Sequence, residues 1–164
     1  LPMARSAVMG GRTIADLVRS AGVQTLMLTV GIIIGFRAGS WPGLVLGLLI
    51  ALLFGFSVSW VFATLGLRVR SPEASQAASF LVVFPFVFAS SIFVPTVTMP
   101  DWLRVFAENQ PVSVIANTVR ALTFPDAPRP DSLESLLLRS ALWIGGILIV
   151  FGFLSVRQYK KAVG

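Results

Sequence analysis

The chain has 164 residues, of which 55% are hydrophobic and 12% are charged, and its mean hydropathy is +0.86. A typical soluble domain carries about 25% charged residues, so this composition indicates a protein that resides largely in lipid. The absence of cysteine and histidine excludes disulfides, imidazole acid–base catalysis and most zinc or haem sites. The net charge is +6, but the arginines are not clustered with aromatic residues on a polar face, so no nucleic-acid partner is expected.

The first segment, residues 1–20, mixes polar and apolar side chains and contains several arginines. It lacks the continuous apolar core and the small-residue cleavage site of a signal peptide. The sequence therefore predicts a cytoplasmic loop over residues 1–20. Because the chain begins with Leu1 and not with Met, we expect it to be a fragment of a longer protein.

Four apolar stretches follow, and each approaches the roughly 20 residues that a helix needs to cross a bilayer. The first is the shortest and includes polar residues, and the second contains an uninterrupted apolar run over residues 44–56. The third is rich in phenylalanine and has Pro85 at its middle, where the missing N–H is expected to kink a helix toward protein or a cavity. We predict an all-α polytopic transmembrane helical bundle with four spans over residues 21–37, 43–67, 77–95 and 136–156.

The orientation follows from lysine and arginine, which are retained in cytoplasmic loops. If residues 1–20 are inside, residues 68–76 and the basic tail 157–164 are inside too, and together they hold most of the Lys and Arg residues. On the outer side the positive and negative residues balance. The sequence thus predicts that both the N-terminus and the C-terminal tail of this chain are cytoplasmic.

The one long outer connection, residues 96–135, is predicted to be exoplasmic and to contain two short interfacial helices. Trp102, Leu103 and Phe106 share one helical face, and a second apolar face recurs over residues 112–122. The proline-rich stretch 124–131 then breaks regular structure. These helices either cap the bundle or take part in gating, and the sequence leaves both possibilities open.

Glycine and serine patterns inside the spans have two interpretations each. The Gly-x-x-x-Gly spacings at Gly31/Gly35 and Gly43/Gly47 permit close helix contact, and packing within one bundle is favoured over a subunit interface. The serines have no histidine or lysine base nearby in the spans, so helix packing is favoured over a nucleophilic role in a membrane enzyme. They are Ser57, Ser59, Ser90 and Ser91.

Energy coupling within this chain is not expected. No Gly-x-x-x-x-Gly-Lys-Ser/Thr sequence is present, so the chain has no P-loop for ATP. No acidic residue lies at mid-membrane depth in the four spans, which argues against a proton-coupled carrier. The energy for any transport must therefore come from a partner or a gradient, and we expect neither a cofactor nor a metal ion in this chain.

Several segments resemble a known family. The outer segment reads Phe93-Val-Pro-Thr-Val-Thr-Met-Pro-Asp-Trp-Leu103, followed by Ala107-Glu-Asn-Gln-Pro-Val-Ser113 and Val119-Arg-Ala-Leu122, and the chain opens with Leu1-Pro-Met-Ala-Arg-Ser-Ala7. In order and spacing these segments are similar to the ABC-2 type transporter permeases, in particular the daunorubicin/doxorubicin-resistance-like drug exporter branch. Six helices are usual in that family, so the chain resembles the last four, and it departs from the common pattern at Ala4.

The resemblance implies a permease dimer, either homodimer or heterodimer, that binds a separate ATP-binding cassette subunit which holds ATP and Mg. A cytoplasmic coupling segment docks into that subunit. Three of its arginines are seven residues apart and would share one face of a continuous helix, unless Gly10-Gly11 interrupts it. Anchoring to lipid headgroups is the alternative role. The residues in this region are Leu1, Pro2, Arg5, Arg12, Asp16 and Arg19.

The resemblance further implies export of a hydrophobic drug or lipid-like compound across a bacterial plasma membrane by alternating access, with no enzyme activity in this chain. A non-transporting assembly subunit and a membrane-embedded enzyme are the alternatives. Phe84, Pro85 and Phe86 are candidates for the pathway or a hinge. The candidates for an outer gate are Pro95, Pro100, Trp102, Asn109, Pro111 and Arg120.

Overall fold

The computed structural model describes the backbone of residues 5–66, 71–129 and 131–163, and within these ranges it describes the side chains between residues 15 and 154, except residues 72 and 97. These residues form α-helices and one short 3-10 helix, with no strand among them, which confirms the all-α prediction. In chain order they are α1 (Arg5–Ile34), α2 (Trp41–Gly66), α3 (Pro72–Phe88), η1 (Thr96–Thr98), α4 (Asp101–Asn109), α5 (Pro111–Thr123) and α6 (Leu133–Val163).

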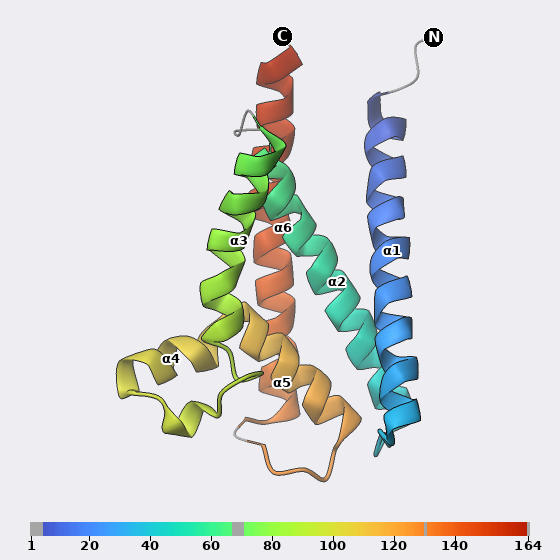
Figure 1. The fold of residues 1–164 in the computed structure, drawn as a ribbon, viewed down its shortest axis with the longest axis vertical. Coiled ribbons are helices and arrows are strands. Elements are labelled where there is room, and N and C mark those ends of the chain that lie inside the picture. The colour runs from blue at the N-terminus through green and yellow to red at the C-terminus, as the bar shows by residue number, and fades with distance from the viewer. Residues whose placement is uncertain (1–4, 67–70, 130, 164) are drawn as a thin grey trace.

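The long helices run between two ends of the molecule (Figure 1). The N-terminal ends of α1 and α3 and the C-terminal ends of α2 and α6 lie at one end. The opposite end carries α4, α5 and the turn between α1 and α2. The chain therefore crosses from one end to the other in alternating directions along α1, α2, α3 and α6, as the spans of a polytopic membrane protein must. Which end faces the cytoplasm stays a prediction.

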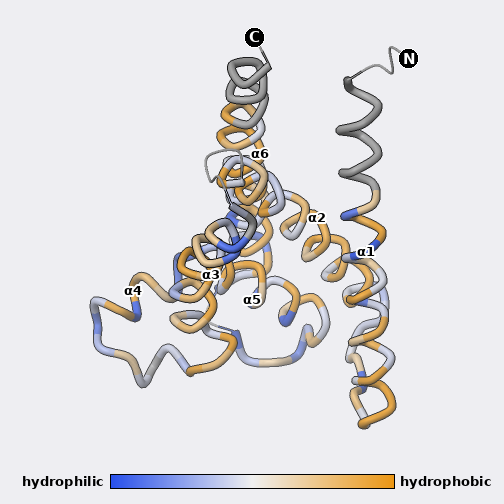
Figure 2. The backbone as a smooth tube through the Cα atoms, turned by 45° about the horizontal axis from the view of Figure 1, so that its top comes forward, coloured by the Kyte–Doolittle hydropathy of each residue, from blue (hydrophilic) through white to orange (hydrophobic). Residues whose placement is uncertain are grey.

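Three of the described helices are long and apolar enough to cross a membrane: Ala15–Ile34 in α1, Trp41–Gly66 in α2 and Leu133–Leu154 in α6. Figure 2 shows the apolar colouring continuing along α2 and through the middle of α6. The remaining predicted span, 77–95, is represented by α3, a shorter apolar helix. At about 1.5 Å per residue, its 17 residues fall short of the roughly 30 Å hydrocarbon core.

The bounds of α3 differ from the predicted span 77–95. The helix begins earlier because Ser71 caps it, accepting a hydrogen bond from the backbone N–H of Ala74 at 3.1 Å, with Pro72 in the first turn. It ends at Phe88, and directly afterwards the Ser90 hydroxyl donates to the Val87 carbonyl at 2.6 Å. Residues 89–95 are therefore not helical but turn toward η1 and α4.

Helix α1 extends into the predicted coupling segment 1–20 and is continuous from Arg5. That this segment is cytoplasmic stays a prediction. No proline lies within this range, and Gly10-Gly11 does not interrupt the helix. The helix ends where Gly35 adopts a φ of +112°, which favours glycine. The Phe36 N–H then donates to the Gly31 carbonyl at 2.8 Å. The pair Gly31/Gly35 therefore ends a helix and does not form a contact between two helices.

Helices α2 and α6 contain the predicted spans 43–67 and 136–156 apart from Leu67, which lies outside the described residues. Both begin a few residues early. At α6 the reason is a cap, since the Ser132 hydroxyl oxygen accepts from the Ser135 N–H at 3.3 Å. At its other end α6 continues through most of the predicted tail 157–164, as far as Val163.

The core lies where α5 packs between α2 and α6. A Cβ placed on Gly43 of α2 would collide with the Leu122 carbonyl, and one on Gly47 would lie 3.2 Å from a methyl carbon of Val119. This glycine pair therefore packs within the bundle, which confirms the favoured interpretation. The buried apolar side chains of the core include Leu44, Val114, Ile115, Ala121, Leu122 and Leu136.

The two predicted short helices are present as α4 and α5, but their surroundings differ. Helix α4 exposes Trp102, Val105 and Phe106, as an interfacial helix would. Helix α5 has most of its side chains buried. It is thus part of the bundle core and not a cap lying on its surface.

Candidate functional site

A polar junction joins the end of α3 to the start of α5, and Gln110 is its centre. The Gln110 backbone N–H donates to the Phe106 carbonyl at 3.0 Å, which caps the end of α4. Its side-chain oxygen accepts from the Val112 N–H at 2.9 Å, which caps the start of α5. Its side-chain nitrogen donates to the Phe86 carbonyl of α3 at 2.9 Å. One residue, only 3% exposed, thereby connects three helices through its backbone N–H and its side chain.

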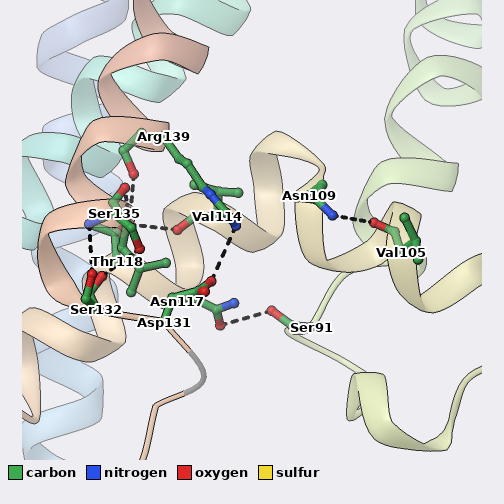
Figure 3. A network of polar contacts seen from close by, with 12 residues as sticks. Ser91, Val105, Asn109, Val114, Asn117, Thr118, Asp131, Ser132, Ser135 and Arg139 are labelled. Atoms are coloured by element: carbon green, nitrogen blue, oxygen red, sulfur yellow. Dashed lines mark hydrogen bonds and ion pairs between the residues drawn. The ribbon is translucent and has the colours of Figure 1, made fainter.

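Ser113 and Asn117 extend this junction along α5. The Ser113 hydroxyl oxygen accepts from the Gln110 side-chain nitrogen at 3.1 Å and from the Ser91 N–H at 2.9 Å. The Ser91 hydroxyl donates to the Asn117 side-chain oxygen at 3.2 Å, and Figure 3 shows these two groups pointing toward each other. Residues 110, 113 and 117 follow the helical period, so they hold the end of α3 along one face of α5. We call Phe86, Ser91, Gln110, Ser113 and Asn117 the α3–α5 junction.

A second polar contact fixes α5 to α6. The Thr118 hydroxyl lies 2.8 Å from the Ser140 hydroxyl, 2.8 Å from the Val114 carbonyl and 3.2 Å from the Leu136 carbonyl. Figure 3 shows Thr118 close to Val114 and near the ion pair between Arg139 and Asp131. Both hydroxyls are buried, and mutual bonding satisfies them where water is excluded.

The predicted outer-gate residues are spread over the segment that includes the junction. Pro95 and Pro100 are exposed and directly precede η1 and α4. Trp102 is exposed on α4, whereas Arg120 near the end of α5 donates to Asn117 at 3.0 Å. These four residues do not form one cluster.

Asn109 and Pro111 are the two predicted gate residues that the structure brings to the junction, because they flank Gln110. The Asn109 carbonyl accepts a hydrogen bond from the Trp143 indole N–H of α6 at 3.1 Å, and Pro111 is buried in the first turn of α5. They are therefore held in place by α6 and by the core. A role in gating stays a prediction.

The predicted pathway or hinge residues lie on α3. The Phe84 ring stacks on Phe88 at 4.1 Å between ring centres, and Phe86 packs against Phe106 of α4 at 5.9 Å. Phe84 and Pro85 are exposed and Phe86 is half-buried. The hydrogen bonds and ring contacts of α3 with other described helices begin at Phe86, directly after the proline. That the Pro85 region faces protein or a cavity stays a prediction.

The predicted coupling residues lie at the N-terminal end of α1. Leu1 and Pro2 are outside the described residues, and at Arg5 and Arg12 only the helical backbone is described. Asp16 and Arg19 are exposed on α1. Because the helix is continuous, the three arginine positions share one face. What this face contacts stays a prediction.

The junction was not predicted from sequence, although one signal was present. Gln110 precedes Pro111, and a polar residue before a proline is typical of a helix start. Ser57, Ser59 and Ser90 each donate to a backbone carbonyl three residues earlier. Ser91 instead donates to the side chain of Asn117, and this pairing across a gap of 26 positions leaves no trace in local sequence.

Long apolar helices around a buried polar helix define a polytopic membrane protein. The chain belongs to the ABC-2 type transporter family, which matches residues 1–124. It is 35% identical over 162 residues to the daunorubicin resistance ABC transporter permease protein DrrB1 of Streptomyces coeruleorubidus, covering 98% of this chain and 56% of that protein. It is 24% identical over 164 residues to the probable doxorubicin resistance ABC transporter permease protein DrrC of Mycobacterium tuberculosis, covering 99% of this chain and 57% of that protein.

The chain thus spans about half the length of the curated relatives that it matches. No solved structure matches it. The family and the relatives' names confirm the resemblance drawn from the sequence. They also describe transporters and permeases, as the resemblance implied.

Proposed function

We propose that this chain is the membrane-spanning part of an ATP-binding cassette exporter in a bacterial plasma membrane. It moves a hydrophobic drug or lipid-like compound out of the cell, while a separate cassette subunit binds ATP and Mg and hydrolyses the ATP. The observation that carries this proposal is the similarity to a daunorubicin resistance permease along 98% of the chain.

In the proposed mechanism the cassette subunit acts on the N-terminal end of α1, where Arg5, Arg12 and Arg19 present one positive face. The movement tilts the long helices, so that access alternates between the two sides of the membrane. The α4–α5 segment acts as the outer gate, and α3 bends at Pro85. The functional unit is a permease dimer.

The test is export by the full permease reconstituted in vesicles with its cassette subunit. ATP added on the cassette side should drive an aromatic drug such as daunorubicin across the membrane, and a cassette variant that cannot hydrolyse ATP should abolish this movement. ATP hydrolysis without movement of any apolar compound would instead support an assembly subunit. Chemical turnover by the permease alone would support a membrane enzyme.

The coupling face offers a second test. Reversing the charge in Arg5→Glu or Arg12→Glu should lower transport per ATP hydrolysed while membrane insertion is unchanged, because the positive face no longer fits its docking site. Arg37→Glu at the opposite end of α1 is the control, since it makes the same charge change in the turn after the helix. If Arg5→Glu, Arg12→Glu and Arg37→Glu all transport the same amount per ATP hydrolysed, the N-terminal end of α1 is not the coupling segment.

A further inference from the structure

The polar and aromatic contacts of α3 with other described helices lie at its C-terminal end, whereas its first turns pack against α2, where Ser75 lies near Gly66. Phe86 accepts from Gln110, its ring packs on Phe106, and Ser91 just beyond the helix bonds to Ser113 and Asn117. Over residues 73–85, by contrast, the described side chains form no hydrogen bond or ring contact with another described helix. Their polar and aromatic contacts, Ser79 with Ser75 and Phe80 with Phe84, stay within α3.

The boundary between the part of α3 that has polar and aromatic contacts with other helices and the part that has none lies at Pro85. Proline has no N–H, so the Leu81 carbonyl lacks its usual donor, and bending costs less there than elsewhere in the helix. The residue directly after the proline, Phe86, is the one that Gln110 holds. A bend at Pro85 would therefore move the first turns of α3 while its last turn stays fixed.

The chemistry at position 110 requires an amide. The side-chain oxygen accepts from the Val112 N–H, while the side-chain nitrogen donates to both the Phe86 carbonyl and the Ser113 hydroxyl. Only asparagine and glutamine offer an acceptor and two donors on one rigid plane, and asparagine is one methylene shorter. A hydrocarbon side chain of similar length would fill the space but form none of these bonds.

We propose that Gln110 is a positioning residue for transport, which makes the last turn of α3 and the start of α5 move as one body while the rest of α3 pivots at Pro85. This inference rests on the proposed function and adds a named residue to it. Because Gln110 also caps α4 and α5, any displacement of the end of α3 is passed directly to the outer α4–α5 segment.

The test measures distances in the full permease with its cassette subunit in lipid vesicles. This chain has no cysteine, so spin labels can be placed at chosen positions once any cysteine elsewhere in the permease is replaced. One pair, Phe88→Cys with Val105→Cys, lies on the fixed side of Pro85, and the other, Leu81→Cys with Val105→Cys, spans the proline; all three positions are more than 50% exposed. The distribution of distances between labels 88 and 105 should be narrow and should be the same with and without ATP plus vanadate. The distance between labels 81 and 105 should shift when nucleotide is added.

The decisive variant is Gln110→Met, which keeps the length of the side chain and removes its hydrogen bonds. It should broaden the first distance even without nucleotide and lower transport per ATP hydrolysed by about tenfold, as expected when a group that positions moving parts is lost. Gln76→Met is the matched control, because Gln76 is exposed near the opposite end of α3, and it should leave both readouts unchanged. If Gln110→Met does not fold, Ser113→Ala, which removes one shared acceptor, should change both readouts in the same direction but less.

Wild-type distances and wild-type transport per ATP in Gln110→Met, or in Ser113→Ala where the first variant does not fold, would overturn the inference. The proposed function fails separately, if the unmodified permease shows no ATP-dependent export. In that case the nucleotide-free distance still tests whether Gln110 fixes α3 to α5.

Discussion

In water-soluble proteins apolar side chains are buried and polar side chains are exposed, and a comparison of α1 with α5 shows the opposite. The apolar part of α1, Ala15–Ile34, has 0% of its most hydropathic window buried within the chain. Helix α5 contains serine, threonine, asparagine and arginine, yet most of its side chains are buried. Lipid solvates apolar side chains as well as a protein core does, so burial in a membrane protein follows small size and hydrogen bonding instead.

The largest expected effect comes from the close approach of α2 to α5. Gly43→Ala places a methyl group against the Leu122 carbonyl, a backbone atom that cannot move aside alone. We expect a loss of about 1–3 kcal/mol in the free energy of unfolding, typical of overpacking. Denaturation of the purified protein in mixed micelles would measure it.

Gly55→Ala is the matched control, since it lies on the same helix with nothing within 4 Å of the added atom. This variant should be neutral or slightly stabilising, because alanine favours helix. Equal stability of the two variants would show that α5 does not pack against α2 as described, and the contrast between α1 and α5 would then lose its basis.

A smaller effect is expected from the polar contact between α5 and α6. Thr118→Val keeps the shape of the side chain but leaves the Ser140 hydroxyl without this partner. The expected loss in the free energy of unfolding is about 1 kcal/mol, the usual size for a hydrogen bond between membrane helices. Thr29→Val on α1 makes the same change where the hydroxyl is exposed and bonds only to its own helix, so a similar loss there would contradict the burial of α5.

The smallest effect concerns the contact of α6 with the end of α4. Trp143→Phe removes the indole N–H that donates to the Asn109 carbonyl. We expect a loss of about 0.5 kcal/mol, because this donor is partly exposed and other partners can replace it. Trp41→Phe, at an exposed position on α2, should cost less, and the difference between the two variants isolates the hydrogen bond.

Composition and hydropathy were enough to predict the helices and the alternation of their ends, since both follow from the length and apolarity of local segments. The packing of Gly43 and Gly47 within the bundle agrees with the favoured interpretation of their spacing, whereas the same spacing at Gly31 and Gly35 ends a helix. Helix ends were less predictable. The start of α3 depends on a cap at Ser71, and the continuity of α1 depends on whether Gly10-Gly11 breaks the helix, which propensity alone does not decide.

The α3–α5 junction could not be predicted from local sequence patterns. Gln110 bonds to a carbonyl 24 positions away, and Ser91 bonds to a side chain 26 positions away. Such pairs arise only when α3 and α5 meet in space. Helix α5 was predicted as interfacial because its apolar residues share one face, and the burial of its polar residues among α2 and α6 became evident only from the packing.

Labelling of single cysteines with a membrane-impermeant maleimide tests most directly whether the chain crosses the membrane with α5 buried at its outer end. Because the chain lacks cysteine, Ala127→Cys, Glu73→Cys and Thr118→Cys each report on one site. In intact cells Ala127→Cys should react, Glu73→Cys should react only after the cells are opened, and Thr118→Cys should resist labelling in both. Reaction of Glu73→Cys from outside would reverse the orientation, and ready reaction of Thr118→Cys would show that α5 is not part of the core.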